Sequence, residues 1–98
     1  MTYKTFSEDC AIRLAGAIDQ MLKEVAGDDT EHIDRTPHRV VVAYAELLSG
    51  VREDPAHVLR VSFEESHYNQ MIHVDSIDFV SVCVHHLLPF YGQVFFSY

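Results

Sequence analysis

The hydrophobic pattern of the chain changes at about residue 60, and this change limits the folds that are open to it. Before that point apolar residues recur at helical spacing, most clearly between Ala11 and Val25. After it, β-branched and aromatic residues dominate the segments 71–74, 77–84 and 93–98. The sequence therefore predicts an α+β fold in which N-terminal helices are followed by an antiparallel β-sheet.

Capping residues indicate where the predicted helices begin and end. A hydroxyl side chain before a helix, a proline in its first turn and a glycine after its last turn are the usual signals. The predicted boundaries are Thr5 (in a capping box with Glu8) to Gly27, Thr36-Pro37 to Gly50, and Asp54-Pro55 to about Leu59.

The segment 77–84 has apolar residues on both faces of the strand that it predicts. Alternation places Phe79 and Cys83 on one face, with Val80 and Val82 on the other. The segment Pro89–Gly92 is predicted to form a corner before the last strand. A lone hairpin of this size is not stable in water, so helices or neighbouring subunits are expected to cover the sheet.

Length and charge restrict the classes of function. The 98 residues predict a single domain, mainly helical over 1–60 and mainly strand over 61–98. A net charge of −8 makes nucleic acid a poor partner. We also expect no membrane association, because no apolar run approaches a membrane span and no signal pattern is visible. The two cysteines are then expected to be reduced, in a cytoplasmic protein.

The last part of the chain is apolar and carries no basic residue. No Lys or Arg follows Arg60, and the segment 93–98 includes two Phe and one Tyr with no turn or polar cap. An unpaired apolar strand edge promotes pairing with another chain. We therefore expect an incomplete sheet, a chain that is a fragment, and self-association.

The run Cys83-Val84-His85-His86 is the candidate reactive site. Thiolate and imidazole are ligands that suit zinc, and a catalytic zinc takes three protein ligands and keeps one position open. Cys83 and His86 would supply two ligands, and His85 would be free for proton transfer. A cysteine packed as a small hydrophobic residue is the alternative for this pattern alone. No third ligand is evident, and Cys10 is not expected to provide one. His73, which interrupts an apolar strand, is expected to be a hydrogen-bonded edge histidine.

The surroundings of this run resemble the GTP cyclohydrolase I family, whose signature reads Ser-x-Cys-Glu-His-His-Leu-Leu-Pro-Phe. The matching segment here is 81–90, and Gly92 follows it as in the family. Further similar blocks occur in the same order along roughly residues 28–98. They are Thr36-Pro37-His38-Arg39-Val40, Ala43-Tyr44, Leu47-Leu48-Ser49-Gly50, Phe63-Glu64-Glu65, Met71-Ile72-His73-Val74 and Ile77-Asp78-Phe79.

The resemblance implies a fold, a reaction and roles for particular residues. The fold would be of the tunnelling (T-fold) type, in which subunits join their sheets in a homo-oligomer, commonly a decamer. The reaction would be zinc-dependent hydrolysis of GTP to 7,8-dihydroneopterin triphosphate and formate, the first step of tetrahydrofolate or other pteridine biosynthesis. By position, Cys83 and His86 would be zinc ligands, His85 a catalytic acid/base, and Arg39 a ligand of the triphosphate.

The chain also departs from the family pattern. Val84 replaces the usual Glu, and the second zinc cysteine, a further catalytic histidine and the guanine-binding Glu of the family would lie in a C-terminal half beyond these residues. Three readings follow. The chain is the N-terminal part of the enzyme and inactive alone, or a catalytically inactive truncated homologue serving as an oligomerisation or interaction module, or an unrelated zinc-binding structural module.

Overall fold

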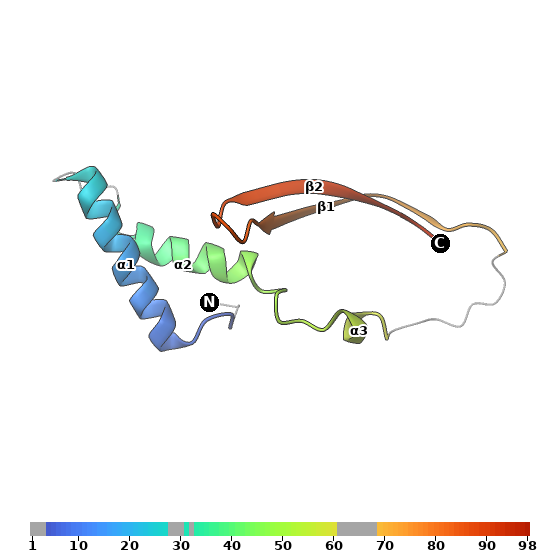
Figure 1. Ribbon diagram of the computed structural model, residues 1–98, viewed down its shortest axis with the longest axis horizontal. Coiled ribbons are helices and arrows are strands. Elements are labelled where there is room, and N and C mark those ends of the chain that lie inside the picture. Colours follow the sequence, from blue (N-terminus) through green and yellow to red (C-terminus); the bar gives the residue numbers. More distant parts are fainter. Residues whose placement is uncertain (1–3, 28–30, 32, 61–68) are drawn as a thin grey trace. The chain divides into compact units, whose positions relative to one another are not determined.

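The computed structural model describes residues 4–27, 31, 33–60 and 69–98. Its elements are α1 (Glu8–Ala26), α2 (Thr36–Leu47), α3 (Pro55–Val58), β1 (His73–Val82) and β2 (Pro89–Ser97), as shown in Figure 1. Helices precede an antiparallel sheet, so the predicted α+β class is confirmed. Of the similar blocks, Phe63-Glu64-Glu65 lies outside the described residues, as do His32 and His67, two histidines in polar parts of the sequence. The chain divides into two compact units, Met1–Val51 and Arg52–Tyr98, which are described separately below.

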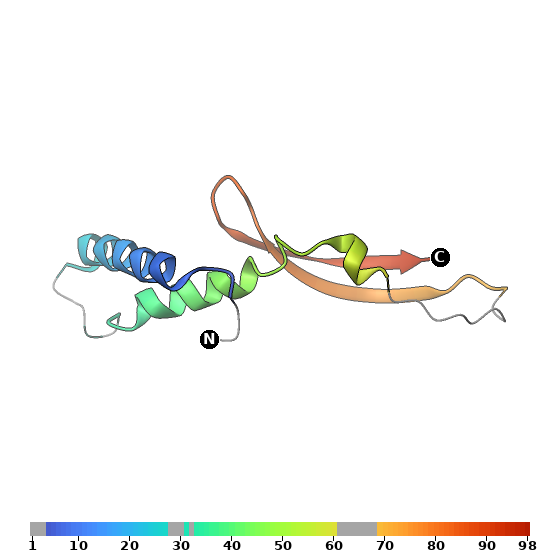
Figure 2. The same ribbon diagram turned by 90° about the horizontal axis from the view of Figure 1, so that it is seen from below.

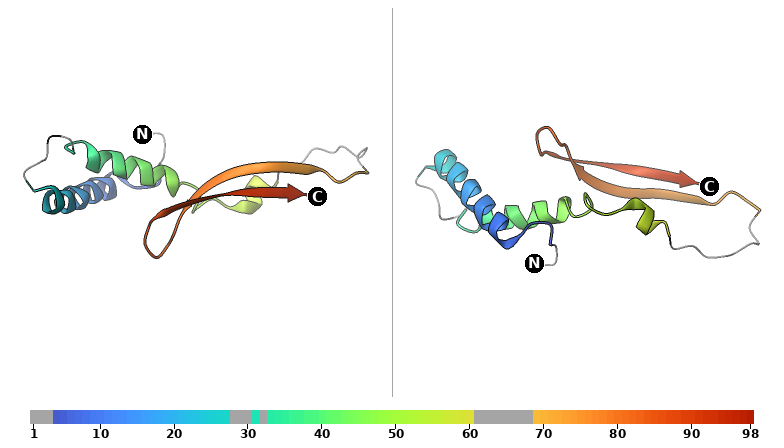
Figure 3. Two further views of the ribbon diagram at one scale, coloured as in Figure 1. Left: turned by 90° about the horizontal axis from the view of Figure 1, so that it is seen from above. Right: turned by 60° about the horizontal axis from the view of Figure 1, so that its bottom comes forward.

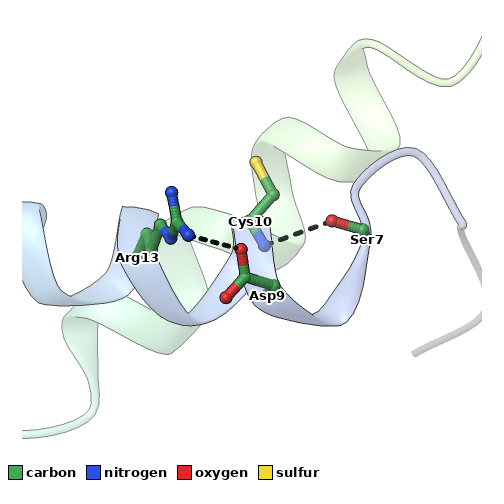
Figure 4. A network of polar contacts seen from close by, with 4 residues as sticks. All are labelled: Ser7, Asp9, Cys10 and Arg13. Carbon is green, nitrogen blue, oxygen red and sulfur yellow. Dashed lines mark hydrogen bonds and ion pairs between the residues drawn. The ribbon is translucent and has the colours of Figure 1, made fainter.

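Helix α1 begins later than the predicted capping box. Its N-cap is Ser7, whose hydroxyl accepts a hydrogen bond from the Cys10 N–H at 3.2 Å. Figure 4 shows this cap beside the ion pair between Asp9 and Arg13 in the first turns of the helix. The Thr5 hydroxyl instead donates to the carbonyl of Ala45 in α2, so Thr5 as cap was wrong. The predicted end was right, since Gly27 caps the helix with a φ of 62°.

Helix α2 is slightly displaced from its predicted bounds. Arg35 is the N-cap, which puts Thr36 inside the helix rather than before it. At the other end, the backbone N–H and the hydroxyl of Ser49 both donate to the carbonyl of Glu46, at 3.1 and 2.7 Å. These bonds tighten the last turn, so the helix ends at Leu47 and Gly50 lies in the turn beyond it.

The core of the first unit lies between α1 and α2, which pack against each other (Figure 2). Val41 and Ala45 are buried there together with Pro37 at the start of α2, and Ala45 is completely inaccessible. Val41 and Ala45 are four residues apart and therefore share one helical face. The second unit contains α3, where Asp54 accepts a hydrogen bond from the Ala56 N–H at 3.0 Å as the predicted N-cap. No helix within the described ranges is both long and apolar enough to cross a membrane.

Strands β1 and β2 form an antiparallel hairpin whose register runs from His73 opposite Ser97 to Val82 opposite Pro89 (Figure 3). The segment Pro89–Gly92 therefore belongs to β2, and the predicted corner was wrong. Proline is tolerated as the first residue of a strand, where its missing N–H costs little. The chain reverses instead through residues 83–88.

The two faces of the hairpin differ in polarity. One, called here the apolar face, has side chains that are 38% to 51% exposed. Within it the rings of Phe79 and Phe90 meet edge to face, with their centroids 6.4 Å apart. The opposite face is mixed: it carries a hydrogen bond of 3.0 Å from Gln93 to Asp78 beside the exposed apolar side chains of Val80, Tyr91 and Phe95. The apolar face consists of Val74, Ile77, Phe79, Phe90, Val94 and Phe96.

Gly92 lies directly opposite Phe79, and the aromatic ring occupies the space beside it. A Cβ atom added at Gly92 would lie 2.8 Å from Cζ and 2.9 Å from Cε1 of Phe79. Such distances are well inside van der Waals contact. Glycine lets the ring of Phe79 lie close to the backbone of the neighbouring strand, and a larger residue would require that ring to move.

A β-bulge interrupts the pairing between Val74 and Ile77, with Ser76 at a left-handed φ of 50°. The side chain of His73, just before the bulge, contacts both the opposite strand and a residue of the bulge. Its Nδ1 lies 2.6 Å from the Ser97 hydroxyl across the hairpin, and its Nε2 contacts the Asp75 carboxylate. The expectation that His73 is a hydrogen-bonded edge histidine is therefore confirmed.

Candidate metal-binding loop

The candidate residues occupy the loop that joins β1 to β2. Two backbone hydrogen bonds close this loop on Cys83. The Cys83 N–H donates to the Leu88 carbonyl at 2.9 Å, and the Cys83 carbonyl accepts from the Leu87 N–H at 2.8 Å. Leu87 has a left-handed φ of 56°. Both polar backbone groups of Cys83 are thus fixed at the point where the strand ends.

This closure brings the sulfur and an imidazole together. Sγ of Cys83 lies 4.0 Å from Nδ1 of His86, with the cysteine half-buried and the histidine exposed. A tetrahedral zinc ion bonded to one sulfur and one nitrogen separates them by roughly 3.5 Å. The observed pair is close to that spacing and needs only a small side-chain movement. The two donors therefore fit a zinc ion by chemistry and by distance.

The described residues provide only this pair. They contain no group of three or more His, Cys, Asp or Glu side chains placed to hold one metal ion. Cys10 is half-buried on α1 and, like Cys83, is a free thiol. It belongs to the first unit, whereas the loop belongs to the second.

The two residues between the pair face water. Val84 is 80% exposed, and His85 is exposed as well. The position where the family usually has Glu is therefore a solvent-facing position on the turn. The imidazole that lies beside the Cys83 sulfur is that of His86.

Arg39, the candidate phosphate ligand, lies in the first turns of α2 with an exposed side chain. Its backbone N–H donates to the Arg35 carbonyl at 3.2 Å, so it is part of the regular helix. Arg39 belongs to the first unit, whereas the loop belongs to the second.

Sequence reasoning missed the backbone conformation that shapes the loop. Leu87 is a leucine in the left-handed region, where Gly, Asn or Asp is the usual signal. It also missed the partners of His73, because Ser97 and Asp75 meet that imidazole only through the register of the hairpin and the bulge. The alternation of β-branched residues contains no sign of either feature.

Comparison with known proteins identifies the class of protein to which the loop belongs. The family model described as GTP cyclohydrolase I matches residues 14–98, which include α2, the hairpin and the whole Cys83–His86 segment. A match of this extent defines the class of protein: the chain belongs to the GTP cyclohydrolase I family.

Individual relatives carry the same name. The chain is 45% identical over 83 residues to GTP cyclohydrolase 1 of Dehalococcoides mccartyi strain 195, an alignment that spans 84% of this chain and 43% of that protein. Identity is 42% over 93 residues with GTP cyclohydrolase 1 of Parabacteroides distasonis, spanning 89% of this chain and 47% of the relative. With GTP cyclohydrolase 1 of Porphyromonas gingivalis it is 39% over 92 residues, spanning 93% and 48%. The chain thus spans just under half of the length of these relatives.

Proposed function

We propose that the complete protein to which these residues belong is a GTP cyclohydrolase I, which hydrolyses GTP to 7,8-dihydroneopterin triphosphate and formate. The observation that carries the proposal is the Cys83–His86 pair, held 4.0 Å apart by the loop of a chain that belongs to this family. The reaction would be the first step of tetrahydrofolate or another pteridine biosynthesis, in the cytoplasm.

Each candidate residue has a role that its chemistry supports. Cys83 and His86 would hold a zinc ion, with a third ligand from outside the described residues. When bound, zinc would supply a Lewis acid for the hydrolysis. His85, exposed beside this pair, would transfer a proton to or from the guanine ring. The exposed guanidinium of Arg39 would hold triphosphate oxygens, which it can grip with two parallel hydrogen bonds.

Zinc retention and GTP turnover test the proposal directly. The 98-residue chain alone is expected to lose zinc on dialysis against a chelator and to give no fluorescent pterin from GTP, because two ligands do not complete a catalytic site. The complete protein is expected to retain zinc and to turn GTP over. Elemental analysis and a pterin fluorescence assay measure the two properties.

Either half of this expectation can be contradicted. Stoichiometric zinc in the dialysed 98-residue chain would show that another of its residues, or one from a neighbouring copy, completes the site. A complete protein that assembles and holds zinc, but leaves GTP intact, would favour the inactive interaction module instead.

The apolar face of the hairpin supports a proposal about partners. Six apolar side chains lie next to one another there, each between 38% and 51% exposed. Contiguous exposed apolar surface of this kind indicates a contact with protein. We infer that the sheet is covered in a homo-oligomer, as in the T-fold assemblies of the family, which are commonly decamers.

Charge substitutions on the two faces of β2 test this association. Phe96→Glu places a carboxylate on the apolar face and is expected to weaken self-association about tenfold or more, because a charge would have to be buried at the contact. Phe95→Lys changes the neighbouring residue on the opposite face and is expected to have a much smaller effect. Light scattering across a concentration series measures both. A parent chain that stays a folded monomer of 11.2 kDa at all concentrations would contradict the inference.

A further inference from the structure

Leu87 has a backbone conformation that its side chain does not favour. Its φ of 56° lies in the left-handed region, where the Cβ of an L-residue crowds the following carbonyl. Non-glycine residues persist there only where the surrounding structure requires it, and such positions concentrate at functional sites. The side chain itself is 53% exposed, so burial of the leucine does not account for the conformation.

The hydrogen bonds around Leu87 show what the conformation achieves. The Leu87 N–H donates to the Cys83 carbonyl at 2.8 Å, which folds residues 83–87 into a single turn. The left-handed step at Leu87 then redirects the chain so that the Leu88 carbonyl reaches the Cys83 N–H at 2.9 Å. An extended residue at this position would carry the chain away from Cys83 and break the second bond.

The same turn determines the spacing of the two candidate ligands. His86 immediately precedes Leu87, and its Nδ1 lies 4.0 Å from Sγ of Cys83. Both side chains extend from backbone that the two hydrogen bonds hold in place. Rotation about the N–Cα bond of Leu87 does not itself move His86, which precedes it. The φ of Leu87 acts instead by bringing the Leu88 carbonyl to the Cys83 N–H, and this second bond keeps closed the turn that carries both donors.

We propose that Leu87 is a positioning residue whose left-handed backbone conformation holds Cys83 and His86 at the spacing needed to bind a metal ion together. The inference deepens the proposed function and rests on its assignment of these two residues as metal ligands. What position 87 requires is a backbone conformation, and the leucine side chain is secondary to it.

Substitutions that separate backbone from side chain test the proposal. Leu87→Gly adopts the left-handed region freely but loses the side chain. Leu87→Val keeps an apolar side chain, but its β-branch disfavours that region strongly. Leu88→Val makes the same kind of side-chain change at the adjacent position, where φ is not left-handed, and is the matched control. All three are made in the full 98-residue chain carrying Cys10→Ala, so that Cys83 is the only thiol.

Cobalt(II) is the probe, and the thiolate-to-cobalt absorption band reports binding through Cys83. Leu87→Val is expected to weaken cobalt binding about tenfold, the equivalent of about 1.4 kcal/mol. Leu87→Gly is expected to bind at least as tightly as the parent, and Leu88→Val to stay within about twofold of it. Amide hydrogen exchange without metal is expected to be faster at position 87 in the Val variant only.

The order of affinities decides the matter. If Gly weakens cobalt binding as much as Val, or more, the leucine side chain is what matters and the inference is wrong, while the metal pair stands. If neither changes binding or exchange, the loop does not depend on Leu87. Because two donors bind weakly, the titration extends to millimolar cobalt. If the parent shows no sulfur–cobalt band even there, the metal pair of the proposed function fails and this inference fails with it.

Discussion

Cys83→Ala in the complete protein is expected to abolish zinc binding. The thiolate is one of two donors that the loop brings together, and alanine offers no replacement at the end of β1. Loss of a residue that only supports a ligand already costs 10–100-fold in metal affinity, so loss of the ligand itself is expected to cost more than about 100-fold. Elemental analysis of the purified variant measures the effect.

The second cysteine of the chain is a matched control for that experiment. Cys10→Ala removes a half-buried thiol from α1, in the other compact unit, and is expected to leave the zinc content unchanged. Full zinc in the Cys83 variant together with loss from the Cys10 variant would reverse the assignment of the two thiols.

His85→Ala is expected to lower the rate of GTP hydrolysis in the complete protein by about 10²–10⁴-fold, the usual contribution of a general acid or base. Zinc is expected to remain bound, because the His85 imidazole is not the one that approaches Cys83. The measurements are the initial rate of pterin formation under saturating GTP and the zinc content of the same preparation.

His86→Ala separates the roles of the two adjacent histidines. It removes the nitrogen that lies 4.0 Å from the cysteine sulfur and is expected to lose both metal and activity. His57→Ala, in the short exposed helix α3, is expected to change neither. If zinc were lost from the His85 variant but kept in the His86 variant, His85 would be the metal ligand and His86 the candidate acid or base.

Local sequence patterns predicted the elements well where the controlling interactions are local. Asp54 and Pro55 start α3 as expected, and Gly27 ends α1. The cap of α1 was wrong because Ser7 and Thr5 are both suitable residues. The choice between them depends on a hydrogen bond from Thr5 to Ala45, 40 positions away in the sequence. A capping pattern contains no information about such a distant partner.

The hairpin turn shows the same limit more clearly. Proline and glycine are strong turn signals, so Pro89–Gly92 was predicted as a corner. In the structure the proline starts β2 and the glycine lies opposite an aromatic ring, while the reversal uses a leucine in a left-handed conformation. The requirement for that left-handed conformation arises from the bonds that close the loop on Cys83, which no residue preference reveals.

The candidate site was predictable in part. The spacing of Cys83 and His86 indicated two donors at the end of a strand, and the structure brings them to 4.0 Å. Their role as ligands, the action of His85 and the contact of Arg39 with phosphate stay predictions. A third ligand could not be identified, because no other His, Cys, Asp or Glu side chain among the described residues is placed to hold one metal ion together with Cys83 and His86.

The contact between Phe79 and Gly92 has a consequence for how this family of sequences can vary. The side chains at positions 79 and 92 would share the same space. The ring of Phe79 occupies it, so a side chain at position 92 would collide with the ring unless the ring moved. A larger residue at 92 should therefore be accepted only together with a smaller one at 79. Gly92→Ala is expected to destabilise the hairpin, and Phe79→Leu in the same chain to restore part of the loss, so that the two changes are not additive. In diverging relatives these two sites should change as a compensating pair.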